Sequence, residues 1–180
     1  MQRINVIGTS CAGKTTFAAK LAAAIRAPHV ELDLLHWEPG WVEVSDAIFT
    51  SGVAAATAGE RWVLDGNYAV MRPIAWPLVD AVIWLDYSFP RVLWRAVTRT
   101  LGRVLRHEPC SNGNYETFRQ QCSRDSIVLW VIRTHHSRRR DFRRLLSTLK
   151  SQGTRVVILR TPAEAERWLG EVRHGVYTTV

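Results

Sequence analysis

The 180-residue sequence predicts a three-layer α/β/α domain in which a parallel sheet of five strands lies between helices. Two observations lead to this fold class. Five short apolar runs alternate with segments of helical periodicity, which is the pattern of a parallel sheet covered by helices. The first of these runs passes through a glycine-containing loop directly into a helix.

The first predicted unit joins a strand, a loop and a helix. Residues 4–7 form a buried, β-branched strand, and apolar residues between 17 and 25 recur at the spacing of one helix face. Residues 8–15 lie between them and match G-x-x-x-x-G-K-[ST] at every fixed position. Strand, loop and helix therefore occur in the order that a phosphate-binding loop requires.

The rest of the chain repeats this alternation. Further strands are predicted at residues 29–32, 61–64, 81–85 and 154–159, and further helices at about 45–56, 90–106, 115–136, 137–150 and from 162 onward. The last helix has a cap at Thr161, a proline at its first position and Glu164 near its start, which together form a capping box. The helix at 90–106 is expected to bury an apolar face made of Trp94, Val97, Leu101, Val104 and Leu105.

Nothing in the sequence divides the chain into parts. It has no internal repeat and no linker, so we expect one domain over residues 1–180. Residues 108–114 combine Pro, Cys, Ser, Asn and Gly, which predicts a mobile loop. We expect this loop to belong to a lid around residues 103–124.

Composition limits the function classes. No apolar run approaches the ~18 residues of a membrane span, and the first strand begins almost at Met1, where a signal peptide would otherwise stand. The three cysteines have the spacing of neither a zinc site nor a disulfide framework. We therefore expect a cytoplasmic protein with reduced thiols and no membrane partner.

The net charge of +8 fits two roles: attraction of nucleic acid, which weakens with salt, or arginines gathered round a small polyanion in a cleft. Placement favours the second role. The helix predicted at 90–106 carries an arginine at every fourth position, with no interleaved acid: Arg91, Arg95, Arg99 and Arg103. A second basic cluster, residues 133–144, contains only one acid, Asp141, and is equally typical of a solvated helix edge.

The loop at residues 8–15 has the chemistry of a phosphate cradle. Its backbone N–H groups point at the oxygens of a polyphosphate, and the following helix adds its positive N-terminal end. Lys14 would reach the β- and γ-phosphates, and the Thr15 hydroxyl would hold Mg²⁺. The predicted phosphate-contacting residues of this segment are Gly8, Ser10, Cys11, Ala12, Gly13, Lys14, Thr15 and Thr16.

Three acidic residues follow predicted strands: Asp33, Asp65 and Asp86. Ligands of open α/β sheets collect outside the carboxyl ends of the strands, which is also the edge that carries the cradle. A carboxylate there can hold Mg²⁺ or accept a proton from an attacking hydroxyl. Strand-end Asp also caps turns, and this second interpretation fits Asp86 best, because Ser88 and Pro90 follow it.

These motifs resemble the adenylate-kinase-like branch of P-loop kinases, and within it the bacterial topology modulation or adenylate-kinase-related proteins. The similarity extends over nearly the whole chain. It rests on the phosphate loop and on three segments: Leu-Asp-Leu-Leu-His-Trp at 32–37, Trp-Val-Leu-Asp-Gly-Asn-Tyr at 62–68, and Asp-Ala-Val-Ile-Trp-Leu-Asp at 80–86.

The resemblance implies a five-stranded parallel sheet, a helical lid, ATP as phosphoryl donor and Mg²⁺. Asp65 matches the acid of the Walker B element and would join Thr15 at the metal. Arg95 and Arg99 match the arginines that enter the lid and contact the adenine and the phosphates. Asp33 is similar in position to the acid on the acceptor side.

Two departures from the family pattern bear on function. Cys11 stands where the family's loop usually has glycine, and Ala69 stands where an arginine closes the nucleoside monophosphate motif, with Arg72 only nearby. AMP is therefore not the expected acceptor.

Together the residues predict an ATP-dependent kinase that transfers the γ-phosphoryl group to a small acceptor, either a nucleotide or a hydroxylated metabolite. Lys14, Asp33 and Arg99 are the predicted catalytic residues. The alternative function is a nucleotide-dependent regulator that binds nucleic acid through residues 133–144. We favour the kinase, because each part of the phosphate site then has a role.

Overall fold

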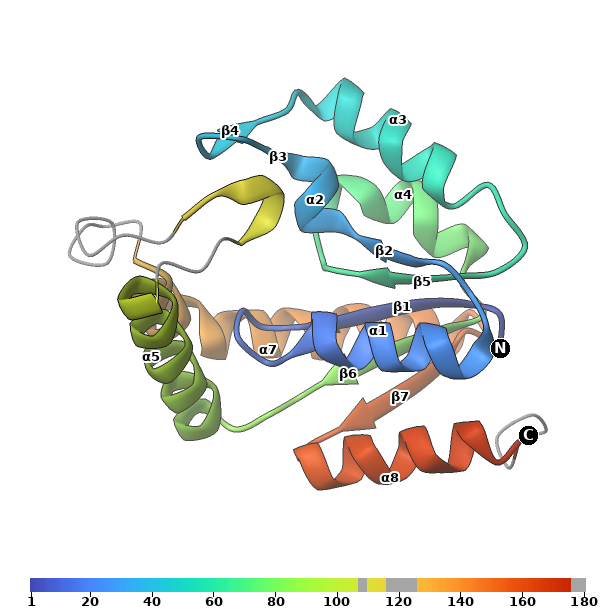
Figure 1. Cartoon of the computed structure of the whole chain (residues 1–180). Coiled ribbons are helices and arrows are strands. Elements are labelled where there is room, and N and C mark those ends of the chain that lie inside the picture. Colours follow the sequence, from blue (N-terminus) through green and yellow to red (C-terminus); the bar gives the residue numbers. More distant parts are fainter. Residues whose placement is uncertain (107–109, 116–125, 176–180) are drawn as a thin grey trace.

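The computed structural model describes residues 1–106, 110–115 and 126–175, and it has the predicted fold class (Figure 1). Five parallel strands form one sheet in the order β2–β5–β1–β6–β7. Their bounds are Arg3–Gly8 (β1), His29–Glu31 (β2), Trp62–Asp65 (β5), Ala81–Leu85 (β6) and Arg155–Leu159 (β7). A short antiparallel hairpin, β3 (Trp37–Glu38) with β4 (Val42–Glu43), lies apart from this sheet.

Helices cover both faces of the sheet (Figure 1). One face packs against α1 (Lys14–Ile25) and α8 (Pro162–Arg173), and the other packs against α7 (Ile127–Ser151) and α3 (Asp46–Ala56). The remaining helical segments are α2 (Leu32–His36), η1 (Ala69–Met71), α4 (Arg72–Ala75), η2 (Trp76–Leu78), α5 (Phe89–Arg106) and η3 (Ser111–Gly113).

The side chains of the central strand β1 contact helices on both faces of the sheet. Ile4 and Val6 point into the core shared with α1 and α8, whereas Ile7 points into the core shared with α7. Successive side chains of a strand alternate between the two faces, so a strand that is buried on both sides needs an unbroken apolar run. The phosphate loop follows this strand, and therefore begins at the middle of the sheet edge.

Asn5 is the polar exception in β1 and is completely buried. Its amide nitrogen donates to the backbone oxygens of Leu64 and Gly66, each at 3.1 Å, and its amide oxygen accepts from the Trp76 indole at 2.9 Å. The side chain therefore holds the chain on both sides of Asp65, the residue that ends β5.

The structure corrects two boundaries of the sequence analysis. The strand expected at 29–32 ends at Glu31, and Leu32 begins α2, so Asp33 lies in a short helix. The boundary expected between helices 115–136 and 137–150 is absent, because α7 continues from Ile127 to Ser151, whereas residues 116–125 of the first predicted helix lie outside the described residues. Residue 137 is a serine, which a long helix tolerates when other positions pack, as Phe142 and Leu146 do here.

The predicted apolar face of α5 is also wrong. Trp94, Leu101 and Leu105 are exposed, by 70%, 46% and 74%. The helix instead buries Val92, Ala96 and Thr100, which follow one another at intervals of four. Small side chains let α5 approach α7 closely, and this contact outweighs burial of the larger stripe.

The predicted lid at 103–124 lies mostly outside the described residues, and remains a prediction. Residues 103–106 end α5, and residues 110–115 contain the turn η3. Among the described helices, none is long and apolar enough to cross a membrane.

We predict that Asn5→Ala lowers the free energy of unfolding by about 2 kcal/mol, because it leaves buried polar partners without hydrogen bonds. Urea denaturation measures this change. Ser147→Ala, at an exposed site on α7, is the control and should change stability by less than about 0.5 kcal/mol. Equal stability of the two variants would contradict the role of Asn5.

Candidate active site

The phosphate loop connects β1 to α1 and needs left-handed backbone conformations at two positions. Cys11 has φ of 63° and Gly13 has φ of 90°. Glycine adopts such values freely, whereas a cysteine does so at a cost of about 1 kcal/mol. Cys11 thus adopts a conformation in which a glycine would be unstrained. The loop ends at Gly13, which caps the N-terminus of α1.

Lys14 and Thr15, the two functional side chains of the motif, lie in the first turn of α1. The Lys14 ammonium is 3.3 Å from the backbone oxygen of Thr9, so it folds back over the loop. No acidic residue occupies the first turn of α1, so the positive end of the helix is not neutralised locally.

Arg95 of α5 lies directly against the loop. Its guanidinium nitrogen is 2.6 Å from the point where a Cβ on Gly13 would stand. Two features therefore require glycine at position 13: the positive φ and the close approach of the Arg95 guanidinium. Arg99 lies one helical turn further along α5 and is partly buried. The structure places Arg95 against the phosphate loop, and its contact with a nucleotide stays a prediction.

Asp65 ends β5 beside the loop, opposite Val6 of β1 and Glu31 of β2. It is only 5% exposed, and its Oδ1 atom has no hydrogen-bond partner. Burial raises the pKa of Asp65, and the charge of Lys14 and the hydroxyl of Thr15 act in the opposite direction. A buried carboxylate oxygen that lacks a partner, beside a threonine hydroxyl, fits a divalent cation such as Mg²⁺.

Within the described ranges no three His, Cys, Asp or Glu side chains converge to hold a metal ion. A cation at Asp65 would therefore take its other ligands from Thr15, from water and from a bound phosphate, which is the usual arrangement for Mg²⁺.

Asp33 and an aromatic wall lie beyond Asp65. The Tyr68 hydroxyl donates to Asp33 Oδ1 at 2.7 Å. Burial and the Asp33 charge raise the pKa of Tyr68, so it stays a neutral donor. The rings of His36 and Phe49 lie 4.4 Å and 5.2 Å from the ring of Tyr68, measured between centroids. Asp33 itself is exposed, so its carboxylate is accessible to a ligand.

Asn67 links the loop to α7. In the amide orientation that satisfies both groups, its nitrogen donates to Gly8 O at 3.0 Å and its oxygen accepts from Arg138 Nη1 at 3.1 Å. Arg72 Nη2 donates to the backbone oxygen of Asn67 at 3.5 Å. The sequence analysis included Asn67 in the motif at 62–68 and Arg138 in the basic cluster 133–144, but it gave neither residue a role of its own.

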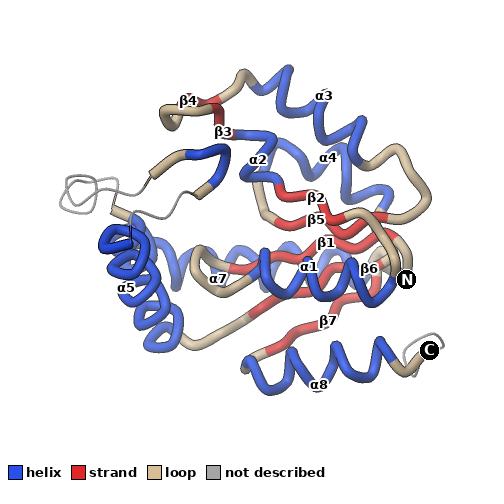
Figure 2. The backbone as a smooth tube through the Cα atoms, viewed as in Figure 1, coloured by secondary structure: helices blue, strands red, loops and turns tan. Residues whose placement is uncertain are grey.

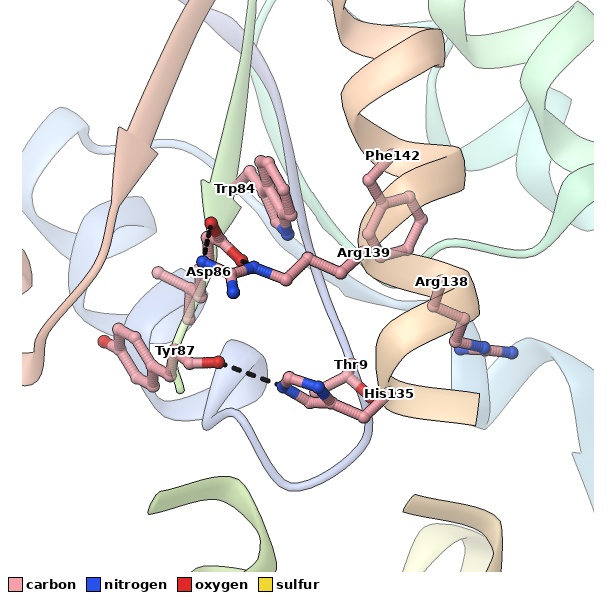
Figure 3. A pocket seen from close by; sticks show the side chains of 9 residues that line it. Thr9, Trp84, Asp86, Tyr87, His135, Arg138, Arg139 and Phe142 are labelled. Carbon is pink, nitrogen blue, oxygen red and sulfur yellow. Dashed lines mark hydrogen bonds and ion pairs between the residues drawn. The ribbon is translucent and has the colours of Figure 1, made fainter. Parts of the chain in front are cut away.

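Asp86 does not belong to the candidate site. It is buried and forms a two-point ion pair with Arg139, at 2.5 Å and 2.9 Å. In Figure 3, Arg139 and His135 extend from α7 towards Asp86 and Tyr87, next to Thr9 of the phosphate loop. Asp86 therefore has a structural role, as the partner of Arg139, rather than a role in binding a ligand.

The basic cluster at 133–144 does not form one surface. Arg139 faces Asp86 and Arg138 faces Asn67, whereas Arg140, Arg143 and Arg144 are exposed. Figure 3 shows Arg138 and Arg139 pointing in different directions from α7.

The hairpin is fastened to the segment 110–115, which lies beside it in Figure 2. Asn114 is 3% exposed, and its Oδ1 atom accepts from the backbone N–H groups of Gly40 and Trp41, at 2.7 Å and 2.9 Å. Its amide nitrogen donates to Glu38 O at 3.0 Å. Asn112 adds bonds to the backbone of α2 and β3. Two chain segments that are more than 70 residues apart thus meet beside the aromatic wall.

Comparison with solved structures finds this fold in several kinases. The chain is similar to a gluconokinase from Sinorhizobium meliloti, at 18% identity and a TM-score of 0.51, covering 98% of this chain and 95% of that one. It is also similar to two shikimate kinases. The one from Bacteroides thetaiotaomicron has 15% identity and a TM-score of 0.54, covering 97% of this chain and 98% of that one.

The shikimate kinase from Aquifex aeolicus has 14% identity and a TM-score of 0.50, covering 98% of this chain and 99% of that one. No family model and no curated protein matches the sequence. At these identities the similarity establishes the fold, and the chemistry has to be argued from the site.

We predict that Asn114→Ala speeds amide hydrogen exchange at Gly40 and Trp41 by about tenfold or more, because each N–H loses its acceptor. Exchange followed by NMR measures this. Ser111→Ala is the matched control, since it alters the same turn but keeps Asn114 and the Ser111 backbone oxygen that accepts from it, and it should keep the protection. Unchanged exchange in the alanine variant would show that Asn114 does not hold the hairpin.

Proposed function

We propose that this protein is a kinase that transfers the γ-phosphoryl group of ATP to a hydroxyl of a small acceptor. The observation that carries the proposal is the convergence at one sheet edge of the phosphate loop, Arg95 against Gly13, and the buried Asp65 oxygen without a partner. The fold agrees with this activity, since the similar structures are kinases of small molecules by name.

The nucleotide would bind along the loop between β1 and α1. The loop amides from Gly8 to Thr16 and the Lys14 ammonium would hold its β- and γ-phosphates. Arg95, and Arg99 one turn beyond it, would neutralise charge on the transferred group. Thr15 and Asp65 would hold Mg²⁺, which when bound neutralises and orients the phosphate oxygens.

Asp33 would orient the acceptor hydroxyl and take its proton. As the acceptor oxygen bonds to the γ-phosphorus, the bond from that phosphorus to the bridging oxygen breaks and ADP leaves. The Tyr68 hydroxyl positions the Asp33 carboxylate, because it donates to one of its two oxygens and leaves the other free for the substrate.

The alternative function, a regulator that binds nucleic acid, has weaker support. Two of the arginines in the cluster 133–144, Arg138 and Arg139, face the protein itself. The narrower resemblance to topology modulation proteins stays a prediction that rests on the sequence motifs.

We predict that Lys14→Ala lowers the rate of ATP consumption on the order of a hundredfold or more, because it removes a cation from the γ-phosphate. A panel of hydroxylated acceptors with Mg·ATP is the assay. Lys20→Ala is the matched control, since Lys20 lies on the same helix but pairs with Glu166 at the surface. If the wild type consumes no more ATP than the Lys14 variant with any acceptor, the kinase proposal fails.

We predict that Asp65→Asn stabilises the protein without nucleotide at pH 7 by about 1 kcal/mol, while it weakens Mg-dependent nucleotide binding. Burial raises the Asp65 pKa above its ordinary value of 3.8. The native state then binds a proton more readily than the unfolded state, so stability falls as pH rises through the pKa of the folded protein.

Urea denaturation at several pH values measures this effect, and the variant should show a smaller loss of stability on going from acid to neutral pH. A variant that is less stable than the wild type at pH 7 would contradict the assignment of Asp65.

A further inference from the structure

His29 begins the edge strand β2 and shares one face of the sheet with Asp65. In the parallel pair of β2 and β5, Glu31 lies opposite Asp65, and His29 lies opposite Val63. Paired residues of neighbouring strands point to the same side of a sheet, and so do residues two apart in one strand. His29, Glu31 and Asp65 therefore all face the side that α1 covers.

The His29 ring is largely enclosed and stands between two carboxylates. Its side chain is 17% exposed. Within the described part of the chain, its Nε2 atom has no hydrogen-bond partner, and Asp65 Oδ2 lies 4.0 Å from it. On the other side of the ring, Nδ1 lies 3.8 Å from Glu31 Oε1. The ring is thus placed to act on either acid.

The surroundings of the ring indicate which of its nitrogens carries the hydrogen. A neutral imidazole has one N–H and can donate to only one of the two carboxylates. The Asp65 side chain is 5% exposed, whereas that of Glu31 is 32% exposed and is reached by water. An acceptor that is cut off from water loses more when it lacks a donor than an acceptor at the surface does. The hydrogen therefore belongs on Nε2, on the side of Asp65.

A donor in this place acts on the orientation of the Asp65 carboxylate. Lys14 and Thr15 approach Asp65 from α1, whereas His29 approaches it from β2. Carboxylates that bind metal ions are commonly held by a further hydrogen-bonding group, and loss of that group typically weakens metal binding by about 10–100-fold. One Asp65 oxygen held from β2 leaves the other oxygen for a cation.

His29 does not itself have the chemistry of a magnesium ligand. Among the described residues, His29, Glu31 and Asp65 do not form a three-residue metal site. Mg²⁺ also prefers carboxylate, carbonyl and water oxygens to imidazole nitrogen. A role through Asp65 is therefore the one that fits the position of the ring.

We infer that His29 is a positioning residue for Asp65: its Nε2–H donates to Asp65 Oδ2 and orients the carboxylate for the cation that accompanies the nucleotide. A shift of about 1 Å brings the two atoms from 4.0 Å to hydrogen-bond distance. In this role His29 touches neither the nucleotide nor the acceptor. The inference rests on the proposed function for the presence of Mg²⁺ at Asp65.

Calorimetry of nucleotide binding with and without Mg²⁺ tests this role. The non-hydrolysable analogue AMP-PNP is titrated into the wild type and into His29→Ala, each in Mg²⁺ and in EDTA. We expect His29→Ala to reduce the gain in affinity that Mg²⁺ provides by about tenfold or more, because Asp65 then lacks its donor. Affinity in EDTA should stay within about twofold of the wild type, since the amides of the phosphate loop are unchanged.

Two further variants separate the donor from the bulk of the side chain. His29→Gln is the conservative variant, because its amide nitrogen can replace Nε2–H as a donor to Asp65. It should keep the Mg²⁺-dependent gain within about threefold of the wild type. His174→Ala is the matched control, since it removes an exposed histidine after α8 and should change neither measurement. Circular dichroism shows whether each variant is folded.

NMR of the histidine ring nitrogens tests the contact without any nucleotide. We expect His29 in the wild type to carry a hydrogen on Nε2, and Asp65→Asn to shift the Nε2 resonance, because the charge of the acceptor is then removed. A ring that carries its hydrogen only on Nδ1 overturns the inference.

The inference is also overturned if His29→Ala keeps the full Mg²⁺-dependent gain, or if it weakens AMP-PNP equally in Mg²⁺ and in EDTA. A loss in His29→Gln as complete as in His29→Ala overturns it as well, because the side chain then acts through its shape. Failure of the wild type to bind AMP-PNP contradicts the proposed kinase instead. The NMR measurement then still tests the contact of His29 with Asp65.

Discussion

The architecture of the site depends on the contact between Arg95 and Gly13. A guanidinium group occupies the place of a side chain that Gly13 lacks, so α5 can lie against the start of α1. To reach this position α5 buries Val92, Ala96 and Thr100 and leaves its larger apolar residues in solvent. The helix α5 also packs on α7, which carries Arg138 and Arg139.

Some charged side chains in and near the candidate site have a partner of opposite charge, and others do not. Asp86 forms an ion pair with Arg139, which makes that arginine a structural residue. Asp65 is buried with one oxygen unpartnered, and Arg72 and Arg138 repel each other. A structure optimised only for stability would pair these groups. The buried Asp65 oxygen without a partner instead indicates a ligand that carries the complementary charge.

Local patterns predicted the sheet, the phosphate loop, the capped helix α8 and the acid at the end of β5. Each depends on residues close in sequence, where strand alternation, helix spacing and loop geometry operate. The buried face of α5 was mispredicted because this helix has two stripes that could face the core. The sequence analysis chose the stripe of large apolar residues, whereas the helix buries the other one. The large stripe contains Trp94, Leu101 and Leu105, and the buried one contains Val92, Ala96 and Thr100. Only the neighbouring helix decides between them.

The residues that the sequence analysis missed make contacts over long distances along the chain. Asn114 binds backbone groups more than 70 residues away, and Asn67 meets an arginine 71 positions later. Asparagine is common in loops, and an arginine within a basic helix has many equivalent neighbours, so neither residue type carries a signal of its partner.

The bonds of Asn114 have a mechanical consequence. The Asn114 carboxamide binds the backbone N–H groups of Gly40 and Trp41 at the hairpin tip, and also the backbone oxygen of Glu38, which precedes them in the chain. These bonds share one side chain, so rotation of the Asn114 carboxamide out of its site would break all of them. The hairpin next to the aromatic wall is therefore tied to residues 110–115, and separation of these two segments requires these hydrogen bonds to break.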